Sequence, residues 1–405
     1  MVYPVPSILD MVLAYINGEM LTWARKRAGF ELDRLAKGSI TVEKLKCWEL
    51  GKDFPTETQA MTIADKLGIS YAMLFMPVVP PPDDLPIPDL RTINCQQLTT
   101  PSLDFRDVLN ATLIRQDWIR DERREGGFES FPFVGRFTLK SNPQTVATDM
   151  RRVLALEPKD RAECPDLEAF IKHLVARAED IGVLVMRSAV VGHDTHRALD
   201  VQEFRGFALS DRFAPVVFIN DADAKAAQVF TIAHELAHIW IGADGISDRR
   251  PNQQNQSENA IELFCDKVAA ELLAPEIEFA KIWRSGLPAL EAARAAATHF
   301  RVSTLVALRR AKDLNRISFS TFLDAVDLEY ERFRQLERRK REKQKEKEKS
   351  GGNFWASFEI RNSRALNSAV VDALVNRRAT FTEASTLLGV TIASTLRYLR
   401  RLQAQ

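Results

Sequence analysis

His234, Glu235 and His238 form the string HELAH inside the apolar run 230–240, in a chain that uses histidine only six times. On an α-helix, residues four apart lie about 40° apart around the axis and about 6 Å along it, so both imidazoles project from one face and can share one ion. Glu235 then lies about 100° away, beside that ion. A lone helical histidine is usually structural, but a complete HExxH string arises by chance on the order of once in a hundred such chains. The spacing therefore predicts a divalent-metal site, with zinc favoured.

A third metal ligand must come from elsewhere, because a catalytic zinc site has three protein ligands and one position open to water. Glu262 is the candidate, since it lies in an apolar helical pattern, residues 261–275, that follows HExxH. This gives a His-His-Glu set, which accepts Zn²⁺ or Mn²⁺. Asp266, one turn further along, is suited to accept the free N–H of a ligand histidine.

The other apolar residues of the HExxH helix recur with the helical period and form one core-facing stripe. The stripe consists of Val229, Ile232, Leu236, Ile239 and Trp240. We therefore expect both histidines to face away from this core-facing stripe.

The elements before this helix change from a helical to a strand period. Residues 103–125 and 142–181 have helical patterns, and three β-branched or aromatic runs follow, at 181–190, 204–210 and 214–220. They predict a small sheet. Residues 216–220 are either an exposed edge, on which an extended substrate could pair, or an ordinary buried strand.

Two further histidines, His193 and His196, share an HxxH spacing. Their neighbours are Gly, Asp, Thr and Arg, which favours an exposed loop over a metal site. The sequence identifies no residue that stabilises the transition state, although Arg205 is a candidate.

The N-terminal region, 1–76, consists of short amphipathic helical patterns with a helix-turn-helix outline. Residues 37–41 form the turn, so 42–49 takes the place of a recognition helix and presents Lys44 and Lys46. Glu43 beside these lysines weakens the surface for phosphate binding, so DNA contact and a purely structural bundle are equally supported. The proline-rich stretch 77–92 predicts an extended linker.

The rest of the chain divides into three predicted segments. Residues 93–320 hold the predicted metal domain, and 321–350 are rich in charges of both signs, which favours a solvated helix over a nucleic-acid arm. Residues 351–405 form a further small helical unit with a helix-turn-helix outline and a basic last helix. Its arginines are Arg397, Arg400 and Arg401.

Composition points to a cytosolic protein. The chain has 405 residues, 45% of them hydrophobic, a formal net charge of +1 and four scattered cysteines. It has neither a disulfide framework nor a long apolar span, so we expect no membrane association. The near-zero charge gives the whole molecule no field that would attract nucleic acid.

Residues 207–242 and 258–275 resemble the ImmA/IrrE family of bacterial metallopeptidases, whose pattern is a strand ending in Asn, FTxAHELxH, and ExxAN followed by LLMP. Cys265-Asp266 stands where Ala-Asn is common and Ala274 where Met is, and neither change removes a ligand. LTWARKRAGFELDRLA and CWELGKDFPT resemble the phage-repressor-type helix-turn-helix domain of some family members.

The resemblance implies an α+β, mostly helical protein: a zincin-like metallopeptidase domain with a small sheet, flanked by N- and C-terminal helical, helix-turn-helix-like domains. It also implies a cytosolic peptidase that cleaves a repressor or antitoxin-like regulator in response to a signal. Zinc held by His234, His238 and Glu262 would lower the pKa of its water to near 7, and Glu235 would act as the general base.

Three classes of function stay open. The protein is a narrowly specific protease, or a DNA-binding regulator or antitoxin whose metal domain senses or only folds, or a scaffold with structural zinc. The intact Glu235 favours the first and the helix-turn-helix outlines the second. The third is weakest, because structural zinc normally has four protein ligands. The sequence does not identify the substrate, the signal that activates cleavage, or the oligomeric state.

Overall fold

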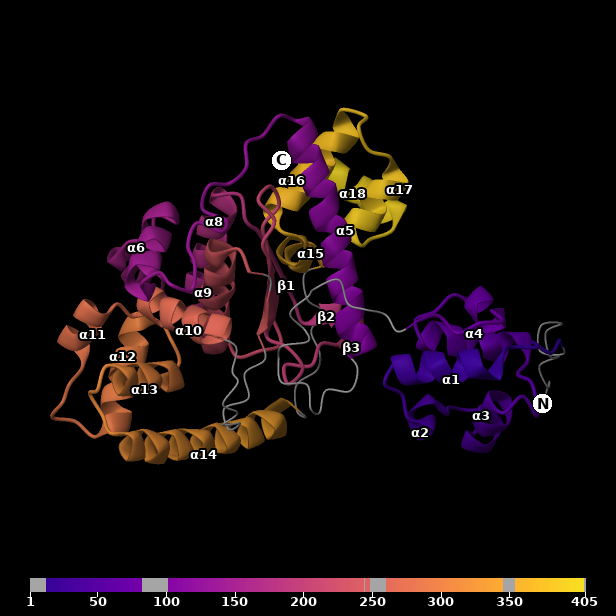
Figure 1. The fold of residues 1–405 in the computed structure, drawn as a ribbon, viewed down its shortest axis with the longest axis horizontal. Helices are drawn as coiled ribbons and strands as arrows, with labels where there is room; N and C mark the ends of the chain where they lie inside the picture. Colours follow the sequence, from indigo (N-terminus) through magenta and orange to yellow (C-terminus); the bar gives the residue numbers. More distant parts are fainter. Residues whose placement is uncertain (1–11, 82–100, 244, 248–259, 345–353, 404–405) are drawn as a thin grey trace. The chain divides into compact units, whose positions relative to one another are not determined.

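The computed structural model describes residues 12–81, 101–243, 245–247, 260–344 and 354–403 (Figure 1). The described residues form two compact units. The first consists of residues 12–81 and 101–110, and the second consists of the described residues from 111 onward. The boundary between the two units therefore falls inside one helix, α5 (Leu103–Glu125). Parts of the predicted segments 77–92 and 321–350 lie outside the described residues. The predicted domain boundaries stay predictions.

The first unit is a helical bundle. Its elements are α1 (Gly18–Arg27), α2 (Leu32–Leu35), α3 (Val42–Glu49), α4 (Glu57–Lys66), the 3-10 helix η2 (Tyr71–Phe75) and the start of α5. Asn17, Thr41 and Thr56 cap α1, α3 and α4 by accepting a backbone N–H, which satisfies donors that a helix start leaves free. A Cβ on Gly18 would lie 2.4 Å from the Glu49 carbonyl oxygen, so glycine permits the close contact of α1 with α3.

The second unit contains the sheet and most of the helices. Before the metal region come α6 (Pro143–Val153), α7 (Pro158–Glu163), α8 (Leu167–Asp180), β1 (Leu184–Ser188), β2 (Val190–Val191), β3 (Asp194–Ala198), β4 (Gly206–Leu209) and β5 (Val216–Asn220). Then follow α9 (Lys225–Ile241), β6 (Gly245–Ser247), α10 (Ala260–Leu273), α11 (Glu276–Ile282), α12 (Ala289–Phe300), α13 (Thr304–Asp313) and α14 (Phe319–Gln344). The last helices are α15 (Phe354–Asn362), α16 (Arg364–Val375), α17 (Phe381–Leu388) and α18 (Ile392–Gln403).

The main sheet is mixed, with strand order β1-β5-β4-β6. β1 and β5 are parallel, with Met186 opposite Phe218, whereas β4 is antiparallel to both β5 and β6. A separate hairpin pairs β2 with β3. Alternating residues of β1 face opposite sides: Val185 packs in the core with α8 and α9, while Arg115 of α5 contacts Met186.

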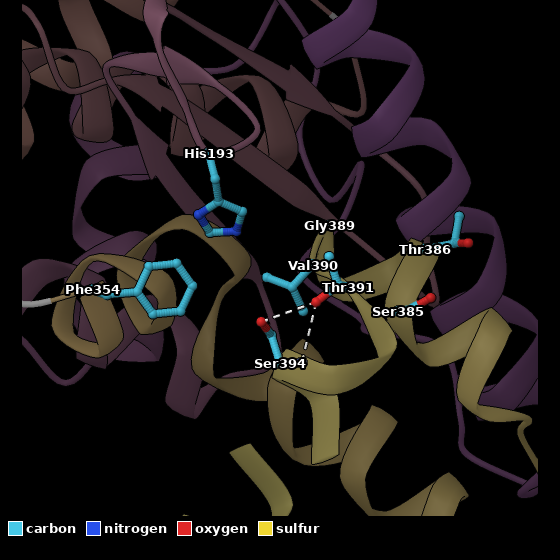
Figure 2. Close-up of a pocket in the computed structure, with 8 residues that line it drawn as sticks. All are labelled: His193, Phe354, Ser385, Thr386, Gly389, Val390, Thr391 and Ser394. Carbon is cyan, nitrogen blue, oxygen red and sulfur yellow. Dashed lines mark hydrogen bonds between the residues drawn. The ribbon is translucent and has the colours of Figure 1, made fainter. Parts of the chain in front are cut away.

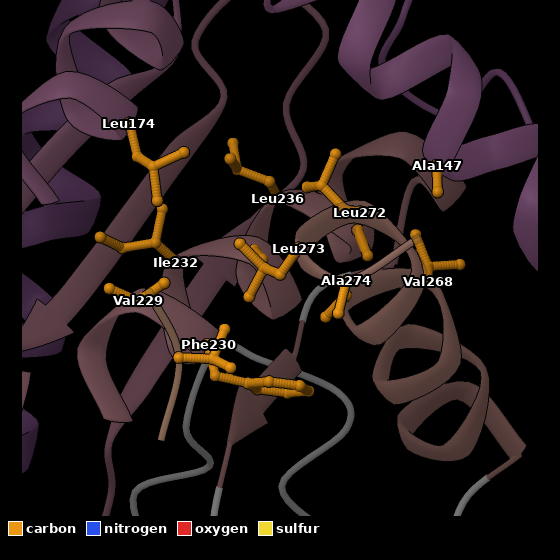
Figure 3. Packing of buried hydrophobic residues seen from close by; sticks show 14 of the residues in the cluster. Ala147, Leu174, Val229, Phe230, Ile232, Leu236, Val268, Leu272, Leu273 and Ala274 are labelled. Carbon is orange, nitrogen blue, oxygen red and sulfur yellow. The ribbon is translucent and has the colours of Figure 1, made fainter. Parts of the chain in front are cut away.

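The core of the second unit lies between α9 and the helices around it. Side chains from α6, α8, α9 and α10 meet there, as Figure 3 shows for Ala147, Leu174, Leu236 and Val268. Within the described residues, no helix is long and apolar enough to cross a membrane.

The predicted fold class is confirmed: the protein is mostly helical, with a small mixed sheet and helical flanks. Two details differ. The predicted helical stretch 142–181 is three helices, interrupted at 154–157, where Ala155 takes a left-handed φ of 48°, and again at 164–166. Residues 216–220 form β5, which lies between β1 and β4 and is buried throughout, so the exposed-edge alternative was wrong.

Candidate metal centre

The helix α9 carries the HExxH string and is buried on all sides from Gln228 to Trp240. His234, Glu235 and His238 are each 0% exposed. The histidines lie opposite the apolar stripe of α9, and their burial comes from α10, which covers them. Gly242 ends α9 with a φ of 68°, a left-handed conformation that favours glycine and lets its N–H cap the last turn.

The helix α10 brings Glu262 over the histidines and is fixed by a buried ion pair. Glu271 near its C-terminus pairs with Arg310 of α13, and both side chains are 9% exposed. The Arg310 Nε also donates to the Ala274 carbonyl, and Arg151 of α6 donates to the Glu271 carbonyl. These contacts satisfy the carbonyl groups at the end of α10 and hold the helix that supplies Glu262.

Three side chains that could act as metal ligands converge between α9 and α10. The Nε2 atoms of His234 and His238 lie 3.1 Å apart, and Glu262 carboxylate oxygens lie 3.1 Å from the first and 3.0 Å from the second. Among the described residues, these are the His, Cys, Asp or Glu side chains that come close enough together to hold a metal ion.

The arrangement fits a divalent cation. Ligand atoms about 2.0–2.1 Å from a tetrahedral zinc lie about 3.3–3.4 Å apart, close to the separations found here. Burial alone would raise the pKa of Glu262, but the hydrogen bonds and charges of both histidines outweigh it and lower this pKa well below its ordinary value. The carboxyl group is therefore ionised, as a metal ligand must be.

Asp266 lies one turn after Glu262 on α10. Its Oδ1 is 2.9 Å from His234 Nδ1. A carboxylate at Nδ1 favours the tautomer with a proton there and leaves the Nε2 lone pair for a metal.

We expect Asp266→Ala to lower metal affinity by about 10–100-fold, because His234 loses the group that orients its ring. Asp266→Asn should retain part of the affinity, because the amide oxygen still accepts the same N–H. A competition titration against a chromogenic chelator measures both values. Equal losses in the two variants would mean that Asp266 does not act through His234.

Glu235 lies against the start of β4. A Cβ built on Gly206 would be 3.2 Å from Glu235 Oε1, 2.7 Å from Thr231 Cγ2 and 2.9 Å from the Phe218 carbonyl oxygen. Gly206 thus leaves room for the Glu235 carboxylate between sheet and helix. Sequence reasoning did not select Gly206, although an isolated glycine in a strand pattern is a known sign of close approach.

We expect Gly206→Ala to slow catalysis by about 10–100-fold, because an added methyl group displaces Glu235 from its position. Metal content should stay at the wild-type level, since the three atoms nearest to the added methyl group belong to Thr231, Phe218 and Glu235 and to none of the metal ligands. Turnover and metal content measured on the same sample would separate the two effects. Loss of metal in parallel with activity would contradict this role.

The other predicted residues do not belong to this group of three converging side chains. His196 is exposed on β3, and His193 in the preceding turn accepts from Arg361 Nη1 at 2.6 Å, so the HxxH pair does not join the metal centre. Arg205 faces Asp223, 3.7 Å away. Lys44 and Lys46 are exposed on α3, where the Lys44 Nζ donates to the Ser39 carbonyl.

A comparison with protein families assigns the region that holds these ligands. Residues 178–312 match the IrrE N-terminal-like domain, Peptidase_M78. The chain carries a Peptidase_M78 metallopeptidase domain. The matched region runs from the end of α8 to α13 and includes the HExxH helix and Glu262 of this M78 domain. A search of curated proteins found no match to the chain.

Proposed function

We propose that the protein is a zinc-dependent metalloendopeptidase that cleaves a bacterial or phage regulatory protein of the repressor or antitoxin kind. The observation that supports it most is the convergence of His234, His238 and Glu262 beside Glu235 inside an M78 domain. A structural zinc site has no need of a general base, whereas peptide hydrolysis does. Mn²⁺ is the alternative metal for the same ligands.

The chain's own residues divide the chemistry between them. A bound zinc supplies an acidic water and polarises the peptide carbonyl. Glu235 accepts the proton of the attacking water and passes it to the leaving amine nitrogen. Asp266 fixes the ring of His234, and burial of α9 keeps bulk water from the carboxylate of Glu235.

The substrate would bind in an extended form along β6. This strand is at one end of the sheet order, and its Ser247 pairs with Gly206, the residue that lies against Glu235. An extended peptide that adds to the outer side of β6 would therefore pass close to the catalytic base.

The resemblance to ImmA/IrrE peptidases supports a cytoplasmic regulator as substrate. The test is to incubate the zinc-loaded protein with the repressor encoded beside its gene and to identify fragments by mass spectrometry. We expect one or a few discrete cuts that a chelator abolishes and added zinc restores. Cleavage that persists in the chelator would refute the metallopeptidase proposal.

The alternative is a DNA-binding regulator or antitoxin whose metal domain is a sensor or a structural element. It is supported by α3, which spans the predicted recognition helix 42–49 and exposes Lys44 and Lys46. Its test is a salt-dependent gel shift with the protein's own promoter. If the DNA is not retarded even at low salt, the DNA-binding alternative is contradicted.

A further inference from the structure

The last two helices of the chain have the geometry of a helix-turn-helix. α17 ends at Leu388 and α18 begins at Ile392, so three residues, Gly389, Val390 and Thr391, connect them. Gly389 has a φ of 67° and its N–H caps α17. A three- to four-residue turn that contains glycine is typical of this motif.

A compact core holds the two helices in place. Thr395 and Tyr398 of α18 are buried, and the Tyr398 ring lies edge-on to Phe358 of α15, with ring centroids 4.8 Å apart. Leu388 of α17 and Val370 of α16 are 0% exposed. The opposite face of α18 is thus a defined surface on a rigid support.

The outward face of α18 is basic. Ala393, Arg397 and Arg400 lie at i, i+4 and i+7 and are exposed, opposite the buried Thr395 and Tyr398. α18 contains three arginines and no acidic residue, and Arg401 lies at the flank, 6.0 Å from the Trp355 ring centroid. Within the part of the chain that the structure describes, none of these arginines forms an ion pair.

Two other arginines of residues 354–403, Arg364 and Arg378, behave differently. Arg364 pairs with Glu179 and Asp180 of α8, and Arg378 pairs with Glu122 of α5. The turn between α17 and α18 also lines a pocket, which His193 and Phe354 border, as Figure 2 shows. None of the residues that line this pocket belongs to the group of His234, His238 and Glu262. Arg364 and Arg378 are therefore neutralised by acidic partners, whereas the arginines of α18 have no ion-pair partner among the described residues.

We propose that α18 is the recognition helix of a second helix-turn-helix and binds the major groove of duplex DNA. Arginines that have no ion-pair partner along one helix face complement phosphates and guanine edges, and the small Ala393 near the N-terminus of α18 allows close approach to the bases. The N-terminal α3 is less suited, because Glu43 lies beside Lys44 on its exposed face. This proposal is independent of peptidase activity.

The test uses the full chain and a fluorescent mixed-sequence DNA duplex, with anisotropy measured over a range of salt concentrations. The variant is Arg397→Gln with Arg400→Gln, which keeps helix propensity. We expect it to lower affinity at least about 10-fold and to reduce the slope of log K against log salt by about 1 for each lost phosphate contact. Thermal unfolding and metal content should stay at wild-type values, because both side chains are exposed.

The matched control is Lys44→Gln with Lys46→Gln, which removes the same charge from α3. The proposal holds if the α18 variant loses affinity while this control binds DNA as wild type does. It is overturned if wild type does not bind the duplex, if the α18 variant binds equally well, if both double variants lose affinity equally, or if single-stranded RNA competes as strongly as the duplex.

Discussion

Replacing Glu235 by glutamine is expected to slow peptide cleavage by about 10²–10⁴-fold, the usual contribution of general acid–base catalysis. Glutamine has nearly the shape of glutamate and fits the fully buried site beside Gly206, but its amide cannot take the proton of the attacking water. Glu235 is not one of the three converging ligands, so metal content should not change.

The control is Glu291→Gln on the exposed face of α12, which removes one carboxylate from the same unit. It should cleave at the wild-type rate. Turnover of the regulator is followed by mass spectrometry and metal by elemental analysis. If the Glu235→Gln protein cleaves as fast as wild type, Glu235 is not the catalytic base.

Glu262→Gln is expected to lower metal affinity by more than about 100-fold, beyond the 10–100-fold cost of losing a residue that only orients a ligand. The variant replaces an ionised carboxylate by a neutral amide, and it leaves the two imidazoles without the negative charge that now lies 3.0–3.1 Å from both. Cleavage should fall in proportion to the metal lost and return in part at high zinc concentration.

Glu262→Asp provides the graded comparison, because it keeps the charge but withdraws it by one methylene. We expect its metal affinity to fall between wild type and Glu262→Gln, with Glu291→Gln again as the control. Competition with a chelator of known affinity measures all four proteins. Wild-type affinity in Glu262→Gln would show that another group completes the site.

The sequence predicted the parts of the site that depend on local geometry. HExxH placed His234 and His238 on one helical face, because the period of an α-helix is fixed. Glu262 and Asp266 could be named because they lie one turn apart on a single amphipathic helix. Whether α9 and α10 would meet was a long-range question, and the 3.0–3.1 Å separations come from their packing.

What the sequence did not predict depends on contacts between distant segments. β6 has only three residues, too few to show an alternating pattern, and the strand order that makes β5 central follows from pairings across the chain. The roles of Gly206 and of the Glu271–Arg310 pair depend on how other elements approach them. Periodicity also could not show that α10 would cover the histidines.

The central claim is that two imidazoles and the Glu262 carboxylate bind the same divalent cation. Anomalous diffraction at the zinc absorption edge, from crystals of the zinc-loaded protein, tests it most directly. We predict one strong peak within bonding distance of His234 Nε2, His238 Nε2 and a Glu262 carboxylate oxygen. A peak bound by other residues, or none between α9 and α10, would contradict it.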